Sequence, residues 1–154
     1  MWSSWFNGVG DHTKGDYKDY MIVINAKSTS DIIFKTTINN LCIGTRYELS
    51  LYGANLNRAG TNYDKPNVSF RIQSAMYPNI TLAEKTSDYM NEYNTFTWIE
   101  YWILFIRPVS SIDLSIISRA SSTVSGNDFA IDDITLRVCS TASKAICWWH
   151  FCLN

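Results

Sequence analysis

The chain lacks a strong net charge: 13 Lys and Arg stand against 14 Asp and Glu in 154 residues, a formal net charge of -1. A surface that neutralises phosphates needs an excess of basic residues, so the composition argues against nucleic-acid binding. The chain has no apolar run of 18 residues, and we expect no membrane-spanning helix. Its first residues lack a basic start and an apolar segment, so they predict no signal peptide in this chain.

The chain also lacks the motifs of common catalytic sites. We find no nucleophile elbow, phosphate-binding loop, zinc signature or cofactor fingerprint. Its two histidines, His12 and His150, and its four cysteines show no zinc-ligand spacing. We expect His12 to form a structural hydrogen bond, and we expect a binding module rather than an enzyme.

The sequence is rich in short apolar segments. Hydrophobic residues make up 46% and aromatic residues 14%, enough to build the core of one domain. No segment has a convincing helical period, and Leu82–Tyr93 has at most the pattern of a short helical turn. The pattern predicts an all-β antiparallel sandwich. The expected strands are residues 20–25, 32–38, 46–54, 68–72, 95–106, 112–117 and 128–138.

The last of these strands carries two adjacent carboxylates, Asp132 and Asp133. Because side chains alternate along a strand, the apolar residues before this pair and those after it fall on opposite faces. All of them reach one core only if an extra residue is inserted at the pair, as in a β-bulge. The apolar residues concerned are Phe129 and Ile131 before the pair, and Ile134, Leu136 and Val138 after it.

We place the domain at residues 1–140 and treat residues 141–154 as an apolar tail outside it. Four cysteines allow three pairings. Cys42 and Cys139 lie in the body of the domain, whereas Cys147 and Cys152 lie in the tail. The sequence leaves two alternatives for Cys42 and Cys139: a disulfide between them, or buried free thiols.

The polar composition suits an extracellular β-sandwich, because Thr and Tyr favour strands while Asn and Ser favour turns. Two glycosylation sequons, Asn67-Val68-Ser69 and Asn79-Ile80-Thr81, agree with a secreted glycoprotein. We therefore expect an extracellular protein.

Two motifs resemble those of MAM domains. Gly10-Asp11-His12-Thr13, followed by Gly15 and Tyr20-Met21-Ile22-Val23, is similar to their opening, and residues 128–136 followed by Cys139 are similar to their closing strand. The closing strand also resembles that of galactose-binding-like, jelly-roll carbohydrate-binding modules. No cysteine precedes Cys42, unlike the family pattern, so the resemblance leaves two alternatives: the chain lacks the family's first strand, or it belongs to a divergent branch. The resemblance implies a jelly-roll fold and a role in glycan binding or cell adhesion.

The resemblance further implies a structural calcium ion held by Asp11, Asp132 and Asp133. Carboxylates and backbone carbonyls are the oxygen ligands that calcium prefers. The alternative is that Asp132 and Asp133 accept hydrogen bonds from backbone donors at the bulge and bind no ion.

Candidate ligand-binding residues come from one strand and one loop. Trp98, Tyr101 and Trp102 lie in the long aromatic segment, where Trp98 and Trp102 share one face and Tyr101 lies on the other. An exposed aromatic ring can stack on a sugar, but core packing is the other explanation of these side chains. Asn55, Asn57 and Arg58 begin a long polar loop and are candidates for hydrogen bonds to sugar hydroxyls.

These observations favour a non-catalytic extracellular module that recognises glycans and carries a structural calcium ion. The alternative is an adhesion module of the MAM type, with a cell-surface protein as its partner. Aromatic side chains lining a groove would favour the glycan, whereas a broad apolar patch would favour the protein partner.

Overall fold

The computed structural model describes residues 4–15, 20–61, 63–106, 108–119 and 126–139, and the backbone of residues 147–148. Within this part of the chain there are nine strands and no helix, so no helix there is long and apolar enough to span a membrane. In chain order the strands are β1 (Ile22–Ile24), β2 (Asp31–Ile38), β3 (Arg46–Asn55), β4 (Val68–Ser74), β5 (Thr81–Thr86), β6 (Ile99–Ile106), β7 (Ile112–Ser118), β8 (Phe129–Cys139) and β9 (Cys147–Trp148).

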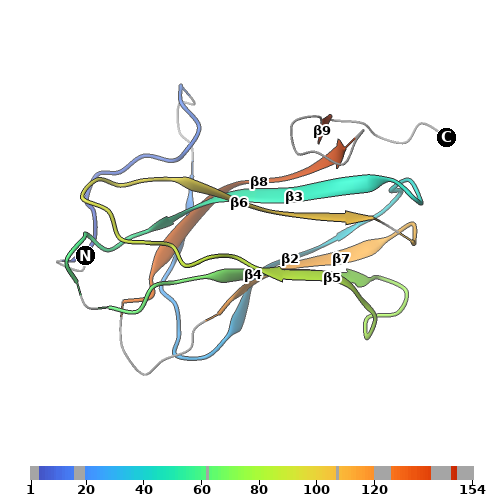
Figure 1. The fold of residues 1–154 in the computed structure, drawn as a ribbon, viewed down its shortest axis with the longest axis horizontal. Coiled ribbons are helices and arrows are strands. Elements are labelled where there is room, and N and C mark those ends of the chain that lie inside the picture. Colours follow the sequence, from blue (N-terminus) through green and yellow to red (C-terminus); the bar gives the residue numbers. More distant parts are fainter. Residues whose placement is uncertain are drawn as a thin grey trace.

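Two antiparallel sheets lie one above the other as the layers of a sandwich (Figure 1). The strand order is β1-β8-β3-β6 in one sheet and β2-β7-β4-β5 in the other. This alternation of early and late strands is the arrangement of an eight-stranded jelly roll, and it confirms the predicted fold class. Strands β6 and β5 are the edge strands at one open side of the sandwich, where they contact each other.

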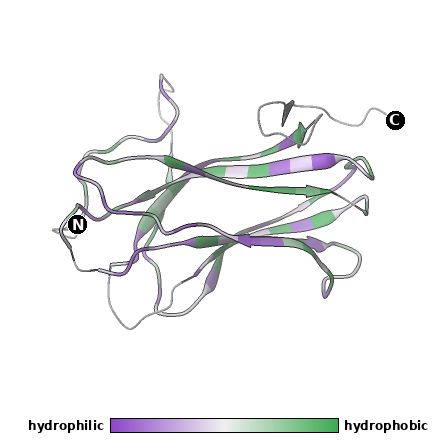
Figure 2. Ribbon diagram, in the orientation of Figure 1, coloured by the Kyte–Doolittle hydropathy of each residue, from purple (hydrophilic) through white to green (hydrophobic). Residues whose placement is uncertain are grey.

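The core lies between the two sheets and follows the period-two pattern of the sequence. Tyr47, Leu49 and Leu51 alternate along β3 and are buried, and they face Phe70 and Ile72 of β4 within one apolar cluster. Figure 2 shows hydrophobic and hydrophilic residues following one another along single strands. Each fully buried Leu or Ile stabilises the fold by about 1.5–3 kcal/mol, so this cluster is the main source of stability.

The predicted β-bulge is present in β8. Ser50 of β3 pairs with Thr135, and Tyr52 pairs with Asp132, so β8 has one more residue between these positions than β3 has. Asp133 takes up the extra residue with a left-handed φ of 48°. The apolar residues on both sides of the bulge reach the same core, as expected: Phe129, Ile131, Ile134, Leu136 and Val138.

One helical-turn prediction and two strand predictions need correction. The short helical turn allowed within Leu82–Tyr93 is wrong, because Thr81–Thr86 is strand β5. This strand pairs only with β4 and lies at an edge, so its side chains are mostly half-buried or exposed and leave little apolar pattern. The strand predicted at residues 95–106 begins only at Ile99. The strand predicted at residues 20–25 is reduced to three residues.

The C-terminal tail contributes two residues to the larger sheet. Cys147 and Trp148 pair with Cys139 and Val138 at the end of β8. The remaining residues of the tail, 141–146 and 149–154, lie outside the described residues.

The cysteines in the body of the domain lie at one end of the larger sheet. Cys139 ends β8 and pairs there with Arg46, the first residue of β3, while Cys42 lies four residues before Arg46. The Cys42 N–H donates a hydrogen bond to the Tyr47 hydroxyl, 2.8 Å away. Neither Cys42 nor Cys139 is a free thiol. That they pair with each other stays a prediction.

Candidate functional site

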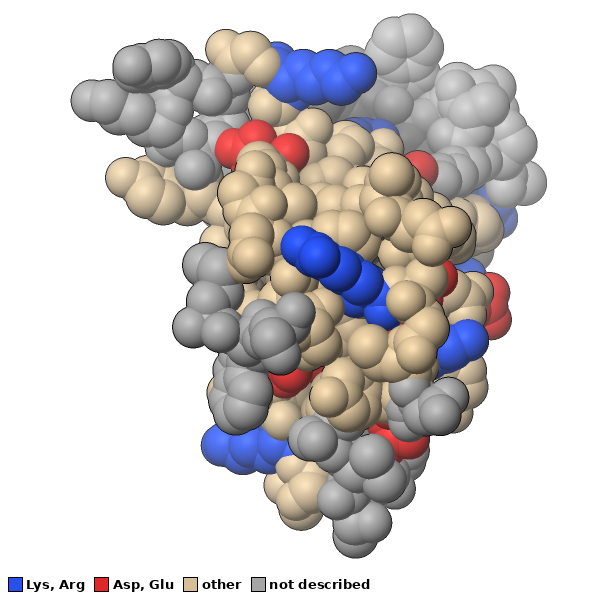
Figure 3. Space-filling view, turned by 90° about the vertical axis from the view of Figure 1, so that its left-hand side faces the viewer, with Lys and Arg blue, Asp and Glu red and all other residues tan. Residues whose placement is uncertain are grey.

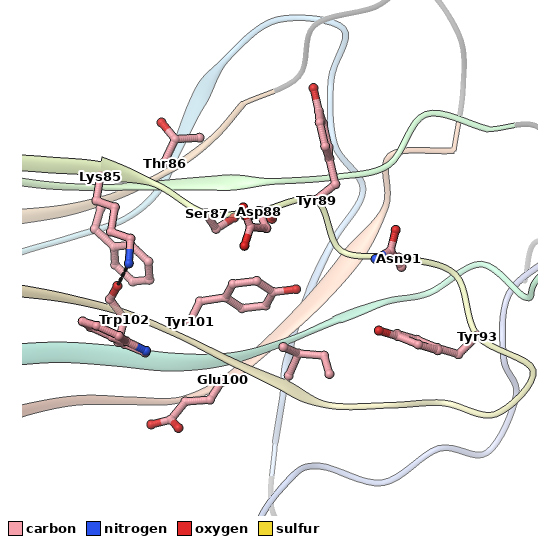
Figure 4. A pocket seen from close by; sticks show the side chains of 12 residues that line it. Lys85, Thr86, Ser87, Asp88, Tyr89, Asn91, Tyr93, Glu100, Tyr101 and Trp102 are labelled. Atoms are coloured by element: carbon pink, nitrogen blue, oxygen red, sulfur yellow. Dashed lines mark hydrogen bonds between the residues drawn. The ribbon is translucent and has the colours of Figure 1, made fainter. Parts of the chain in front are cut away.

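A groove of about 310 Å³ opens between the edge strands β5 and β6 (Figure 4). One wall is the end of β5 and the segment that follows it, and the other wall is the first half of β6. The lining combines two apolar side chains, Phe70 and Ile99, with aromatic rings and with polar and charged groups. The lining residues are Phe70, Lys85, Thr86, Ser87, Asp88, Tyr89, Asn91, Tyr93, Ile99, Glu100, Tyr101 and Trp102.

Strand β6 places both of its predicted aromatic residues in this groove. Because β6 is an edge strand, its inward and outward side chains both line the opening between the sheets. Tyr101 points inward and is 9% exposed, whereas Trp102 points outward and is half-buried. Glu100 shares the outward face of Trp102, and in Figure 4 its carboxylate points away from Tyr101. The alternation predicted for this strand is therefore confirmed.

Lys85 links the two walls through Trp102. Its ammonium donates a hydrogen bond to the Trp102 carbonyl oxygen, 3.0 Å away, and lies 4.2 Å from the centre of the Trp102 ring. A cation over an aromatic face is attracted by about 0.5–1 kcal/mol at an exposed site. Lys85 therefore covers one face of this ring and ties β5 to β6.

Tyr101 supplies a hydrogen-bond donor inside the groove. Burial raises the pKa of its hydroxyl to about 12, with further contributions from the nearby Tyr93 and Asp88. In Figure 4 the Tyr101 and Tyr93 hydroxyls point toward each other, and Asp88 lies above Tyr101. The Tyr101 hydroxyl therefore stays protonated at neutral pH, beside a carboxylate that can only accept hydrogen bonds.

The wall formed by residues 87–93 is held by the predicted polar loop. The Asn55 side-chain amide donates to the Met90 carbonyl oxygen at 3.0 Å. The Ala59 N–H donates to the Tyr93 carbonyl oxygen, also at 3.0 Å, and the Met90 N–H donates to the Pro66 carbonyl oxygen at 2.8 Å. Asn55 is buried, so it positions this wall and offers no group to a ligand.

The structure places Asn57 and Arg58 outside the groove. Asn57 is fully buried, and its side-chain amide donates to the Gly126 carbonyl oxygen, because the loop folds back against the start of β8. Arg58 is exposed, and its guanidinium lies 5.7 Å from the centre of the Phe6 ring. Composition alone had suggested both residues as ligand-binding groups, and the folded loop instead gives them contacts within the protein.

Trp98 belongs to a second aromatic cluster, away from the groove. Its ring meets Phe96 edge to face at 5.1 Å and His12 at 6.1 Å between ring centres. His12 in turn stacks on Tyr52 of β3. Trp98 precedes β6 and does not share the environment of Trp102, although the two residues have the same parity in the sequence.

The bulge carboxylates hold residues 12–13 against β8. Asp132 accepts a hydrogen bond from the His12 N–H at 2.8 Å and another from the Asp133 N–H at 2.8 Å. Asp133 pairs with His12 Nδ1 at 2.8 Å and accepts a hydrogen bond from the Thr13 hydroxyl at 2.9 Å. Asp132 therefore accepts hydrogen bonds from backbone donors, as the backbone-capping alternative describes, whereas Asp133 contacts the side chains of His12 and Thr13.

The calcium ion that the resemblance implies, held by Asp11, Asp132 and Asp133, stays a prediction. The oxygens of Asp132 and Asp133 accept hydrogen bonds from protein donors, and Asp11 is half-buried next to His12. Among the described residues, no three His, Cys, Asp or Glu side chains come close enough together to hold a metal ion.

Several groove residues were missed by reasoning from the sequence. Lys85, Asp88, Tyr89 and Tyr93 lie in the segment whose apolar pattern was thin. The available signal was the composition of residues 87–93, in which tyrosines are interleaved with Asp, Asn and Ser. These residues follow neither the period of a strand nor the period of a helix. Such a composition is typical of a surface segment that presents aromatic rings, but it does not say against which strand the segment lies.

Comparisons with known proteins identify a similar fold. No protein-family model matches the chain, and no curated protein matches its sequence. A solved structure described as "EclA C-terminal domain; sugar-binding protein" is similar over 88% of this chain and 89% of that chain, with 22% identity and a TM-score of 0.55. The fold is a jelly roll.

Two further solved structures are similar at a lower level. One, described as "CBM4 structure and function", has 17% identity and a TM-score of 0.46 over 68% of this chain and 59% of that chain. The other is the VP2 subviral particle of infectious bursal disease virus, with 13% identity and a TM-score of 0.45 over 74% of this chain and 29% of that chain.

Proposed function

We propose that this protein is a non-catalytic module that binds glycans in the groove between β5 and β6. The observation that carries the proposal is the groove itself, in which Tyr93, Tyr101 and Trp102 line the same opening as Asp88 and Asn91. Its volume of about 310 Å³ is suited to a small number of sugar units. The jelly-roll fold, shared with a domain described as sugar-binding, supports this proposal.

The chemistry of the lining suits sugar rings. Apolar faces of sugars stack on aromatic rings, and their hydroxyls need both donors and acceptors at the edges. Tyr101 supplies a protonated hydroxyl and Asp88 supplies a carboxylate. Asn91 supplies a side-chain N–H donor, while its Oδ1 accepts a hydrogen bond from the Lys65 ammonium at 2.9 Å. Since the groove is open at the edge of the sandwich, a longer glycan chain has room to extend beyond it.

A glycan array probed with the full chain tests the proposal. We expect selective binding by the wild type and a loss of at least about tenfold in affinity for Trp102→Ala, because a stacking aromatic contributes about 1–3 kcal/mol in comparable sites. Trp98→Ala is the matched control, since Trp98 lies off the groove, and it should retain binding. A folded wild-type protein that binds no glycan would refute the proposal.

The alternative is a protein-interaction module. It is supported by exposed apolar side chains at β1 and β2, which lie at the other side of the sandwich from the groove-forming strands β6 and β5. Tyr20, Ile22 and Val23 at β1, and Ile32 of β2, are all at least 44% exposed. Light scattering of the purified chain and a pull-down with extracellular extract test this alternative. A stoichiometric complex that persists in the Trp102→Ala variant would favour it.

We include an extracellular location and a Cys42–Cys139 disulfide in the proposal. Asn79 and Thr81 of the second sequon are exposed in and after the β4–β5 turn, whereas Ser69 of the first is fully buried. Expression in a secretory host should therefore yield glycan on Asn79. Peptide mapping without reduction should recover Cys42 joined to Cys139, and recovery of either residue joined to another cysteine would contradict the pairing.

A further inference from the structure

The two walls of the groove belong to one continuous piece of chain that turns back on itself at one end. Residues 87–98 join β5 to β6, and they turn at the left-hand end of the sandwich in Figure 1. Figure 3 looks onto this end, where mainly uncharged side chains lie at the surface. In Figure 4 the chain turns back toward β6 just beyond Tyr93. A ligand that lies along the groove therefore meets the connecting segment at this end.

The connecting segment is held in place by contacts with the rest of the domain. The Tyr93 carbonyl oxygen accepts a hydrogen bond from the Ala59 N–H at 3.0 Å. The Phe96 ring meets the rings of Phe6 and Trp98 edge to face, at 5.7 Å and 5.1 Å between ring centres. Aromatic rings in this arrangement attract each other, so this end of the groove is closed by a packed segment.

Lys85 closes the other end of the groove. Strand β5 contributes only its last two residues to the lining and β6 only its first four, so the groove stops at the level of Lys85 and Trp102. There the Lys85 side chain spans the two walls, with its ammonium 3.0 Å from the Trp102 carbonyl oxygen and 4.2 Å from the centre of the Trp102 ring. Figure 4 shows this bridge on one side of Tyr101 and Tyr93 on the other.

Between these two ends the groove opens to solvent along its side. Tyr89 and Tyr93 are 57% and 39% exposed, whereas Tyr101 is 9% exposed. A ligand therefore enters through this side opening. Because the connecting segment and Lys85 stand at the two ends, the middle of a linear glycan would have to bend back out of the opening by which it entered.

We propose that the groove binds the terminal sugars of a glycan and not an internal segment of a linear chain, with Lys85 as the residue that closes it. The inference rests on the proposed function, because it names the part of the glycan that the same groove takes. The last ring of a chain or branch lies between the two ends, where the Tyr101 hydroxyl and the remaining N–H groups of Lys85 donate to its oxygens. The rest of the glycan leaves through the side opening.

The test is calorimetric titration of the full chain with linear glycans of increasing length. The probes are xylo-, manno-, cello- and galacto-oligosaccharides, followed by their parent polysaccharides of known chain length. For the series that binds, we expect one protein molecule per glycan chain whatever its length, because each chain has one end of each kind. Wild-type protein that binds in numbers proportional to chain length would overturn the inference.

Blocking the two ends of the binding oligosaccharide in turn with a bulky group gives a second measurement on the wild type. One block should weaken binding at least about tenfold, because that end no longer enters the groove, and the other block should be tolerated. Binding that survives both blocks would contradict terminal recognition.

Variants of Lys85 test its role in closing the groove. Lys85→Ala removes the bridge, so a chain can pass Trp102, and the number of protein molecules bound per polysaccharide should rise with chain length. Lys85→Arg restores a cation and a donor across the groove and should restore one protein per chain. The control is Lys35→Ala, which removes an exposed lysine of β2 at the far edge of the smaller sheet and should behave as wild type.

The outcomes separate the inference from the proposed function. Lys85→Ala that still binds one molecule per long chain would overturn the role of Lys85. A folded protein that binds neither these series nor any glycan on the array would instead refute the proposed function, and the inference with it.

Discussion

At the scale of single residues, the structure separates two asparagines that look equivalent in the sequence. Asn55 holds the groove wall through Met90, whereas Asn57 holds the loop to Gly126. We predict that Asn55→Ala weakens glycan binding severalfold, because residues 87–93 lose an anchor. Asn57→Ala should lower the free energy of unfolding by about 1–3 kcal/mol, the cost of removing a buried hydrogen bond, with binding retained. Denaturant unfolding and calorimetric titration measure both effects, and equal losses of binding would contradict the distinction.

Gly53 lies next to Met90 and to Tyr101, which lines the groove. A Cβ at this position would lie 2.8 Å from Met90 Cε and 3.2 Å from Tyr101 Cε2. Gly53→Ala therefore forces Met90 and the Tyr101 ring to move, and we predict a loss of about 1–2 kcal/mol in the free energy of unfolding. Gly10→Ala is the control, because a Cβ at Gly10 meets nothing within 4 Å. Comparable stability of the two variants in urea would show that the core behind Tyr101 accommodates the methyl group.

At the scale of elements, β4 and β5 are joined by a network of charges on their outer face. Glu84 of β5 pairs with Arg71 of β4 at 2.9 Å and also with Arg119. The hydrogen bond from Arg71, followed by the charges of both arginines, lowers the pKa of the Glu84 carboxyl below its ordinary 4.5. This pairing therefore stabilises the fold above pH 4.5, and the contribution is lost as the pH falls through the lowered pKa.

We predict that Glu84→Gln lowers the free energy of unfolding by about 0.5–1 kcal/mol at pH 7, a modest value because the pair is partly exposed. The difference from wild type should shrink as the pH falls below 4.5. Urea unfolding at pH 7 and pH 3 measures the effect, and a double-mutant cycle with Arg71→Gln isolates the pair. A difference that grows toward acidic pH would contradict the direction of the pKa shift.

The bulge of β8 provides the other test at this scale. The hydrogen bonds from residues 12–13 to Asp132 and Asp133 predict a melting temperature that neither calcium nor a chelator changes. The sequence resemblance implied instead that Asp11, Asp132 and Asp133 bind calcium. In that case the melting temperature should rise when calcium is added, and the Asp132→Ala/Asp133→Ala variant should lose this rise. Thermal melts of both proteins, with calcium and with chelator, decide between these outcomes.

The strands also show how much of the fold could be predicted from the sequence. The bulge at Asp132 and Asp133 was predictable because the parity of the buried residues changes there, and parity is a local property. Strand β5 was not predictable in the same way, because an edge strand with one bonded neighbour can expose most of its side chains. Trp98 and Trp102 share parity yet separate in space, since the strand begins only at Ile99.

At the scale of the whole molecule, the candidate site depends on the topology. The jelly-roll order makes β5 and β6 the edge strands at one side of the sandwich, so segments from two different sheets meet to form the groove. Tyr101 and Trp102 were predictable as aromatic candidates, because their strand alternates cleanly. Asp88, Tyr93 and the supporting role of Asn55 were not, because each depends on which strand its segment lies against.

The central claim, that glycan binds between β5 and β6, is tested most directly by amide chemical-shift mapping. The isotope-labelled full chain is titrated with an oligosaccharide of the class that it binds on the array. The account predicts that the largest shifts fall within residues 85–93 and 99–102, and that Trp102→Ala removes them. Shifts centred on His12, Tyr52 and Trp98, with residues 85–93 unaffected, would contradict it.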